Sequence, residues 1–200
     1  MCGIVGFVNN KENKEKIIKD MSKKIEHRGP DGEGFYIDDN CALAHRRLAI
    51  IDLNTGAQPI YNEDKSKVII YNGEVYNFKE LKEALLKKKH VFKTKTDTEV
   101  ILHGYEQWGE KLPNHLRGMF SFAIWDKNKN ELFMARDGFG IKPLYYAKFN
   151  DTFMFASEPK AFLANPDFEK KLNTDILSAY LCFNSVPTSE TFFKGVYRLD

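Results

Sequence analysis

The sequence predicts an α/β or α+β domain in which helices and antiparallel strands pack in layers. Its 200 residues, 42% of them hydrophobic and 14% aromatic, are enough for one domain with a sizeable core. Short apolar runs typical of strands alternate with runs of helical period, and clear turn signals separate them. No internal repeat, low-complexity segment or long linker interrupts this order, so we expect helices to cover the sheet faces.

The chain is expected to begin with a buried strand over Cys2–Val8. An apolar residue then recurs every four positions, which predicts a helix that ends near Gly29; its apolar stripe is Ile17, Met21 and Ile25. The polar run HRGPDGEG follows, and its three glycines and single proline predict a mobile loop over His27–Gly34.

Further strands and two helices are predicted before the middle of the chain. The strand-like runs are Gly34–Ile37, Cys41–Arg46 and Val68–Tyr71. Two pairs of residues stand at capping-box spacing ahead of runs with helical period: Asn77 with Glu80, and Thr96 with Glu99. We therefore expect helices over Phe78–Leu86 and Asp97–Trp108.

The second half is expected to form antiparallel sheet. The turn-like runs DKNKN and FND each separate two strand-like runs, which predicts two hairpins. The expected strands are Gly118–Trp125, Glu131–Arg136, Leu144–Lys148 and Thr152–Ala156. A last helix is expected over Asp175–Phe183.

Composition argues against several classes of function. The formal charge of +2 comes from 30 basic and 28 acidic residues, a balance that argues against a nucleic-acid surface. No apolar run is long enough to span a membrane, and no signal peptide is present. The three cysteines are an odd number without metal-ligand spacing, and no signal peptide precedes them, so a reducing cytoplasm is expected.

Metal, phosphate and papain-like sites also lack support in the sequence. No metal site is expected, because the five histidines show no metal-ligand spacing: they are His27, His45, His90, His103 and His115. His27 and His45 are interpreted as packing residues, whereas a papain-like protease would need a histidine beside its cysteine. The run GFGIK lacks the full spacing of a P-loop and precedes a strand.

Cys2 has two interpretations. It can be a small apolar residue of a buried first strand, as isolated cysteines usually are. If Met1 is removed, however, Cys2 carries a thiol and a free α-amine on one residue. The amine has a pKa of about 7.7–8.0 and the thiol about 8.5, so near pH 8 the neutral amine can take the thiol proton. This is the chemistry of an N-terminal nucleophile hydrolase.

Polar residues stand where predicted strands end and helices begin. Arg47 follows the strand ALAHRR, the triplet Asn72-Gly73-Glu74 follows VIIY, and Asp97 opens a helix. Each has a structural explanation on its own: a surface cation, a turn and a helix N-terminus.

Combined with Cys2, these residues suit an amide hydrolase acting on glutamine. Asn72 and Gly73 could supply N–H donors to an oxyanion, and Arg47 could hold the α-carboxylate bidentately. Either Asp97 or Glu74 could pair with the α-ammonium. Every charged group of glutamine then has a complement.

Nine runs in one order also carry a family resemblance, from Cys2 to about Leu163. They are CGIVGF, HRGPD, LAHRRLAIID, GAQPIYN, YNGEVYNFKEL, KTDTEVIL, LRGMFSFAIWD, ARDGFGIKPLYY and FASEPKAFL. The chain resembles the glutaminase domain of class II glutamine amidotransferases and, within them, that of glutamine-hydrolysing asparagine synthetases.

The resemblance implies a four-layer αββα sandwich, the N-terminal nucleophile fold, with two antiparallel sheets between helix layers. It implies that Cys2 releases ammonia from L-glutamine through a thioester, with Asn72 and Gly73 assisting and no cofactor in this domain. The glutamine pocket that it implies comprises Arg47, Leu48, Ala49, Ile50, Ile51, Asn72, Gly73, Glu74 and Asp97.

Two alternatives stay open. The first is the glutaminase domain of another class II amidotransferase, namely a phosphoribosyl-pyrophosphate amidotransferase or a glucosamine-phosphate synthase. These two carry other residues at the position of Glu74, whereas Glu74 in NGEVYN resembles the asparagine synthetase branch. A β-lactam-synthetase-like scaffold that has lost its cysteine is the second alternative. The presence of Cys2, Arg47, Asn72 and Asp97 argues against it.

The resemblance assigns residues 1–170 to the glutaminase domain and residues 171–200 to an extension leading to an absent synthetase domain. That domain, expected to bind ATP and Mg, would convert aspartate to asparagine; no pyrophosphatase loop for it occurs in this sequence. The run GVYRLD lacks the expected returning strand, so Asp200 is interpreted as the end of a fragment. A cytoplasmic location is expected, with no nucleic-acid or membrane partner, and a homodimer stays open.

Overall fold

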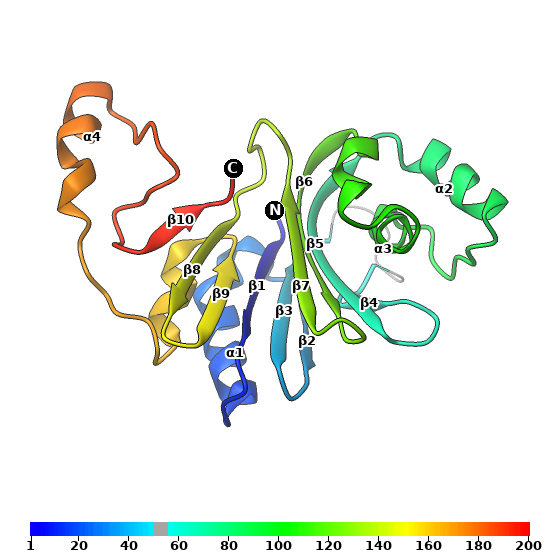
Figure 1. Cartoon of the computed structure of the whole chain (residues 1–200), viewed down its shortest axis with the longest axis horizontal. Helices are drawn as coiled ribbons and strands as arrows, with labels where there is room; N and C mark the ends of the chain where they lie inside the picture. Colours follow the sequence, from blue (N-terminus) through cyan, green and yellow to red (C-terminus); the bar gives the residue numbers. More distant parts are fainter. Residues whose placement is uncertain (50–55) are drawn as a thin grey trace.

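The computed structural model describes residues 1–49 and 56–200, which form two antiparallel sheets with helices on the outer face of each (Figure 1). The six-stranded sheet has the order β10-β8-β9-β1-β3-β2, with strands β1 Gly3–Val8, β2 Gly32–Ile37, β3 Cys41–Arg47, β8 Tyr145–Phe149, β9 Thr152–Ala156 and β10 Val196–Arg198. The four-stranded sheet has the order β4-β5-β6-β7, with strands β4 Ile60–Tyr61, β5 Lys67–Val75, β6 Gly118–Asp126 and β7 Glu131–Arg136.

Alternating side chains divide the interior into three apolar cores, and these cores define four layers. Ile4 of β1, Leu43 of β3, Ile70 of β5 and Trp125 of β6 belong to the core shared by the two sheets. Their neighbours in sequence point the other way, toward the helices. The predicted αββα sandwich is therefore confirmed.

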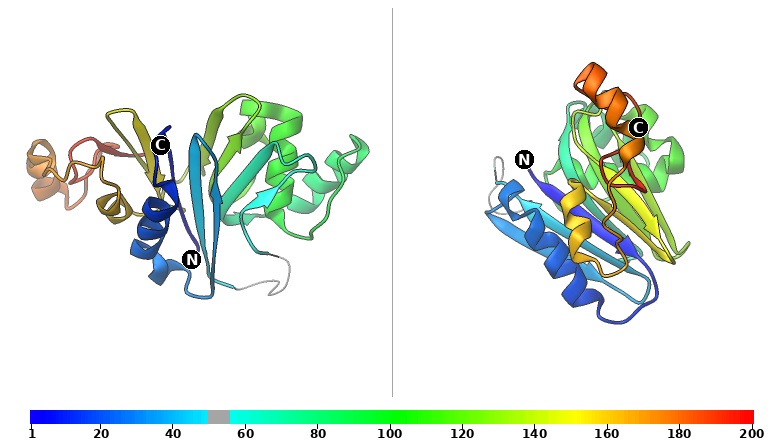
Figure 2. Two further views of the ribbon diagram at one scale, coloured as in Figure 1. Left: turned by 90° about the horizontal axis from the view of Figure 1, so that it is seen from below. Right: turned by 90° about the vertical axis from the view of Figure 1, so that its left-hand side faces the viewer.

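Each outer core joins a sheet to its helices (Figure 2). Helix α1 (Lys14–Lys24) and the 3₁₀ helix η3 (Pro159–Ala164) cover the six-stranded sheet. Helices α2 (Phe78–Lys87) and α3 (Asp97–Trp108), with the 3₁₀ helix η2 (Gly109–His115), cover the four-stranded sheet. The remaining helical segments are η1 Glu26–Arg28, η4 Thr174–Ile176 and α4 Leu177–Phe183. No helix within the described ranges is long and apolar enough to cross a membrane.

The capping-box prediction gave the right helix starts for the wrong reason. Neither Asn77 nor Thr96 makes a side-chain capping bond. The Asn77 side chain instead accepts a bond from Arg117 N and donates one to His115 O, which ties α2 to the segment before β6. At Asn77 the side chain satisfies two backbone groups of that segment in place of a local cap.

The predicted mobile loop over His27–Gly34 is wrong at both ends. His27 and Arg28 belong to η1, and Gly32 already pairs with Arg47 in the six-stranded sheet. Within this run, a Cβ on Gly34 would lie 1.9 Å from Gln58 O. Gly34 therefore permits a close backbone approach and does not mark flexibility.

Candidate active site

Cys2 lies at the entrance to β1, immediately before Gly3, which pairs with Arg46 of β3. Figure 1 shows the N-terminus between the two sheets. The Cys2 thiol is partly buried; its Sγ accepts a bond from Leu48 N at 3.5 Å and donates to Leu48 O at 3.8 Å.

The main chain of Cys2 is fixed by Arg28, a residue that the sequence analysis did not single out. Arg28 Nε donates to Cys2 O at 3.0 Å, and Arg28 Nη1 pairs with Glu158 at 3.0 Å. Glu158 also binds His27 and Lys160. Burial alone would raise the pKa of Glu158, but hydrogen bonds from Arg28, His27 and Lys160 hold it at about 2. Cys2 is thus linked through Arg28 to a carboxylate that stays ionised across the physiological range.

Asn72 lies inside strand β5, not in the turn that Asn-Gly suggested. It is 2% exposed and pairs across the strands with Ser121 of β6. Among the described residues, neither Asn72 Nδ2 nor Ser121 Oγ has a hydrogen-bond partner. Buried donors are almost always paired, so an orphaned amide donor points to a ligand that completes it.

Gly73 follows Asn72 in the strand and fits only as glycine. A Cβ at this position would lie 2.3 Å from Met119 O and 2.7 Å from Phe120 Cα, both in the backbone of β6. Phe120 lies opposite Gly73 on β6, but its N–H donates to the Asp137 carboxylate and its C=O accepts a bond from Asp137 N. Gly73 and Phe120 therefore form a pair without hydrogen bonds between them. The Gly73 N–H therefore points away from β6.

The neighbouring backbone donors along this edge of β5 are occupied. Tyr71 N donates to Gln58 Oε1 at 2.6 Å, and Val75 N donates to Asp97 Oδ2 at 2.9 Å. Gly73 lies between them and, since alternate residues share an edge, its N–H faces the same side. No described strand pairs with Gly73 there. This leaves the Gly73 N–H beside the Asn72 amide as a second donor.

Asp97 is held at the start of α3 by both the backbone and a side chain of β5. Besides Val75 N, it accepts a bond from Tyr71 Oη at 2.7 Å. Burial raises the pKa of Tyr71 well above its usual value, and the charge of the neighbouring Asp97 carboxylate raises it further. Asp97 is therefore fixed beside the strand that carries Asn72 and Gly73.

His45 connects the six-stranded sheet, which Cys2 precedes, to the four-stranded sheet, which carries Asn72. His45 Nε2 lies 3.1 Å from Tyr71 O, across the interface between β3 and β5. Burial lowers the pKa of His45 to about 4, so the neutral ring donates this bond at physiological pH. Its interpretation as a packing residue at a strand end is consistent with this contact.

The other residues of the glutamine pocket implied by the resemblance either lie at or after the end of strand β3, near Cys2, or are exposed on β5. Arg47 ends β3, and its carbonyl accepts a bond from Asp31 N at 3.0 Å. Ala49 N donates to the Asp31 carboxylate at 2.9 Å, and Glu74 is exposed on β5. Ile50 and Ile51 lie outside the described residues, so their predicted place in the pocket has no structural counterpart here.

Two solved structures share this architecture. The chain superposes on a glutamine phosphoribosylpyrophosphate amidotransferase from B. subtilis in complex with ADP and GMP, with a TM-score of 0.70, 22% identity and coverage of 86% of this chain and 45% of that one. The allosteric regulatory enzyme of purine biosynthesis gives a TM-score of 0.69 at 23% identity over 82% of this chain and 43% of that one. The fold is that of the N-terminal nucleophile hydrolases.

The chain belongs to the glutamine amidotransferase domain family, whose match spans residues 1–200. It is 43% identical to asparagine synthetase [glutamine-hydrolyzing] 1 and 44% identical to asparagine synthetase [glutamine-hydrolyzing] 2, both from Bacillus subtilis. It is 39% identical to putative asparagine synthetase [glutamine-hydrolyzing] 2 from Methanocaldococcus jannaschii. All of this chain is covered in each comparison, but only 32%, 28% and 42% of the respective relatives. The family resemblance predicted from the sequence is confirmed.

Proposed function

We propose that this chain hydrolyses L-glutamine to glutamate and ammonia through a thioester on Cys2. The observation that carries the proposal is the pair of N–H donors without described partners, Asn72 Nδ2 and Gly73 N, on the strand facing the nucleophile's sheet. Donors fixed by a sheet and unpaired before substrate binds suit an oxyanion that forms only during reaction.

The steps follow from the groups at the site. Once Met1 is removed, the Cys2 α-amine takes the thiol proton, and the thiolate attacks the carboxamide carbon of glutamine. Asn72 and Gly73 donate to the oxyanion. The protonated α-amine then gives its proton to the departing nitrogen, the C–N bond breaks, and ammonia leaves a thioester on Cys2. Water hydrolyses the thioester to glutamate and restores the thiol.

The charged end of glutamine has complements in the same site. Arg47, beside Cys2 at the end of β3, suits the α-carboxylate, since a guanidinium binds a carboxylate bidentately. Asp97 suits the α-ammonium, because its position is fixed by Tyr71 and Val75 while its charge is unmatched by any contact cation among the described residues. Glu74 is the second carboxylate within reach.

In a longer protein we propose that residues 1–170 form the glutaminase domain and residues 171–200 lead to a linked synthetase domain. The lengths and printed names of the relatives support this. The ammonia would there serve the ATP-dependent conversion of aspartate to asparagine in the cytoplasm, with ATP and Mg bound outside this chain.

Glutamate release with and without thiol alkylation tests the glutaminase proposal. We expect alkylation to stop glutamate release from protein whose Met1 has been removed. Release that alkylation does not change would exclude Cys2 chemistry. No release from a fully processed sample would favour the catalytically inactive scaffold.

Replacing Asn72 with alanine is expected to lower turnover by about 10²–10³-fold while KM changes little, because one donor to the oxyanion is lost. Ser121→Ala is measured in parallel, because Ser121 lies directly across the strands and its buried hydroxyl also lacks a described partner, so the comparison shows whether the loss is specific to the Asn72 amide. Steady-state kinetics of both variants decide the outcome. If Asn72→Ala raised KM alone, Asn72 would belong to ground-state binding.

Replacing Asp97 with asparagine is expected to lower kcat/KM for glutamine by about 10²-fold, because the ammonium loses a desolvated charge partner. Asparagine can still accept the bonds from Tyr71 and Val75, so the fold should be retained. Glu74→Gln, measured in parallel, identifies which carboxylate pairs with the ammonium. An equal loss with an amide that lacks the α-amino group would show that Asp97 acts through the fold instead.

A further inference from the structure

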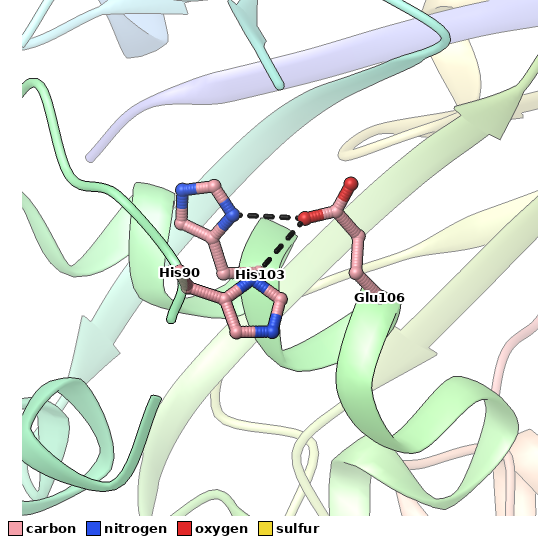
Figure 3. Close-up of side chains that lie close together, drawn as sticks. All are labelled: His90, His103 and Glu106. Carbon is pink, nitrogen blue, oxygen red and sulfur yellow. Dashed lines mark hydrogen bonds and ion pairs between the residues drawn. The ribbon is translucent and has the colours of Figure 1, made fainter. Parts of the chain in front are cut away.

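A second polar cluster lies away from Cys2, where the connection after α2 meets helix α3. His103 and Glu106 lie one turn apart on α3, and His90 comes from the connection between the helices (Figure 3). His103 Nδ1 is 2.9 Å from Glu106 Oε2, and His90 Nδ1 is 3.6 Å from the same oxygen. Two imidazole nitrogens and a carboxylate oxygen therefore converge on one point.

These three atoms have the separation of ligands around a metal ion. All lie within 4.8 Å of one another. Tetrahedral zinc holds nitrogen and oxygen ligands at about 2.0–2.2 Å, which places neighbouring ligands roughly 3.3–3.5 Å apart. The distances from Glu106 Oε2 to the two histidines, 2.9 and 3.6 Å, lie on either side of that spacing, and the two imidazole nitrogens lie within 4.8 Å of each other. Two histidines and a glutamate also form a recurring set of zinc ligands.

The surroundings of His103 match the outer shell of a metal site. Its other nitrogen, Nε2, is buried without a described hydrogen-bond partner and lies 3.6 Å from Glu63 Oε1 and 3.7 Å from Glu99 Oε1. Metal-bound histidines commonly direct their second N–H to a carboxylate, which fixes the tautomer and the ring orientation. Glu99 is in turn held by the backbone N–H groups of Lys93 and Thr94.

The third ligand is oriented in the same way. Glu106 Oε1 accepts a bond from Asn62 Nδ2 at 2.7 Å, which leaves Oε2 directed at the two histidines. Glu63, Glu99 and Glu106 also concentrate negative charge around His103. Three carboxylates around one imidazole favour a cation at this cluster.

We propose that His90, His103 and Glu106 bind a divalent transition metal ion of the zinc class. The ion would fasten the connection before α3 to the helix that begins at Asp97. Its role would be structural, since none of its ligands belongs to the Cys2 site. Metal spacing is not visible in the sequence, because His90 lies on a connecting segment and the other two ligands lie on a helix.

Cobalt(II) titration monitored by visible absorption tests the proposal, because Co²⁺ reports its ligands directly. The titration is done in a Cys2→Ala, Cys182→Ser background, which removes both thiols with solvent access. We expect one Co²⁺ per chain with a ligand-field spectrum of nitrogen and oxygen ligands. Zn²⁺ should displace the Co²⁺ and raise the midpoint of thermal unfolding.

Variants of the ligands locate the site. His90→Ala and Glu106→Gln are each expected to weaken Co²⁺ binding by more than about 100-fold, since loss of a ligand should exceed the effect of losing an outer-shell partner. His115→Ala is the matched control, because His115 is exposed and stacks on Trp108. Circular dichroism checks that each variant is folded. Absence of binding, or equal affinity in all three variants, would overturn the proposal and leave the cluster as a hydrogen-bond network.

Discussion

Glutamate release will fall to the uncatalysed background when Cys2 is replaced with alanine, because the proposed thioester mechanism uses Cys2 as its nucleophile. The thiol is small and partly buried, and its described contacts are with Leu48 alone. Alanine therefore removes the sulfur without opening a large cavity. Turnover should be lost while the circular dichroism spectrum and thermal unfolding stay close to those of the parent.

The other two cysteines differ in their value as controls. Cys182 is exposed on α4, so Cys182→Ser should keep full activity. Cys41 is fully buried in the core between the sheets, and burial raises the pKa of its thiol well above the usual value. Cys41→Ala tests packing, whereas Cys182→Ser tests the specificity of the chemistry. Comparable turnover by Cys2→Ala and Cys182→Ser would refute the thioester mechanism.

The spacing of hydrophobic residues along the sequence correctly predicted most of the strands and helices. The predicted strands Glu131–Arg136 and Thr152–Ala156 and the helix Asp97–Trp108 match the observed bounds. These segments carry strong local patterns that tertiary packing reinforces. By contrast, β4 and β10 are short, with Ile60–Tyr61 and Val196–Arg198, and exist only because a longer strand offers an edge. Segments of two or three residues are too short to show the alternation of apolar and polar residues that predicts a strand.

The triplet Asn72-Gly73-Glu74 shows where sequence reasoning failed and why. Asn-Gly is a strong local turn signal, so the strand was expected to end at Tyr71. In the fold, β5 continues to Val75 because β6 pairs with it over its whole length. Gly73 is required by the close backbone of β6, and Asn72 occupies an inward-facing position of a strand. Only the register of the partner strand reveals both facts.

Residues that position the site could not be found from spacing. Arg28 and Glu158 are 130 residues apart in sequence, and Tyr71 and Asp97 are 26 apart. Arg28 lies in the run HRGPD and Glu158 in FASEPKAFL, so both were in segments that carried the resemblance. Their roles depend on contacts made only after the two sheets have assembled. Sequence identified the segments, and the fold identifies the side chains within them.

Protein that retains Met1 will be catalytically silent even though the pocket around it is formed. With Met1 attached, the nitrogen of Cys2 belongs to a peptide bond and has no basic lone pair to take the thiol proton. Met1 also occupies space at the site, where Lys142 Nζ lies 3.3 Å from its sulfur. Loss of the base and obstruction of the entrance act together, so we expect no measurable glutamate release.

Two preparations of the same chain separate these effects from folding. One is treated with methionine aminopeptidase and the other keeps Met1, with intact mass spectrometry giving the fraction of each form. Activity should rise in proportion to the processed fraction, while the thermal unfolding midpoint should change little, because Met1 lies outside β1 and is 52% exposed. Full activity in a sample that retains Met1 in every molecule would remove the α-amine from the mechanism. The proton would then have to leave Cys2 by another path, and no histidine is in contact with its sulfur among the described residues.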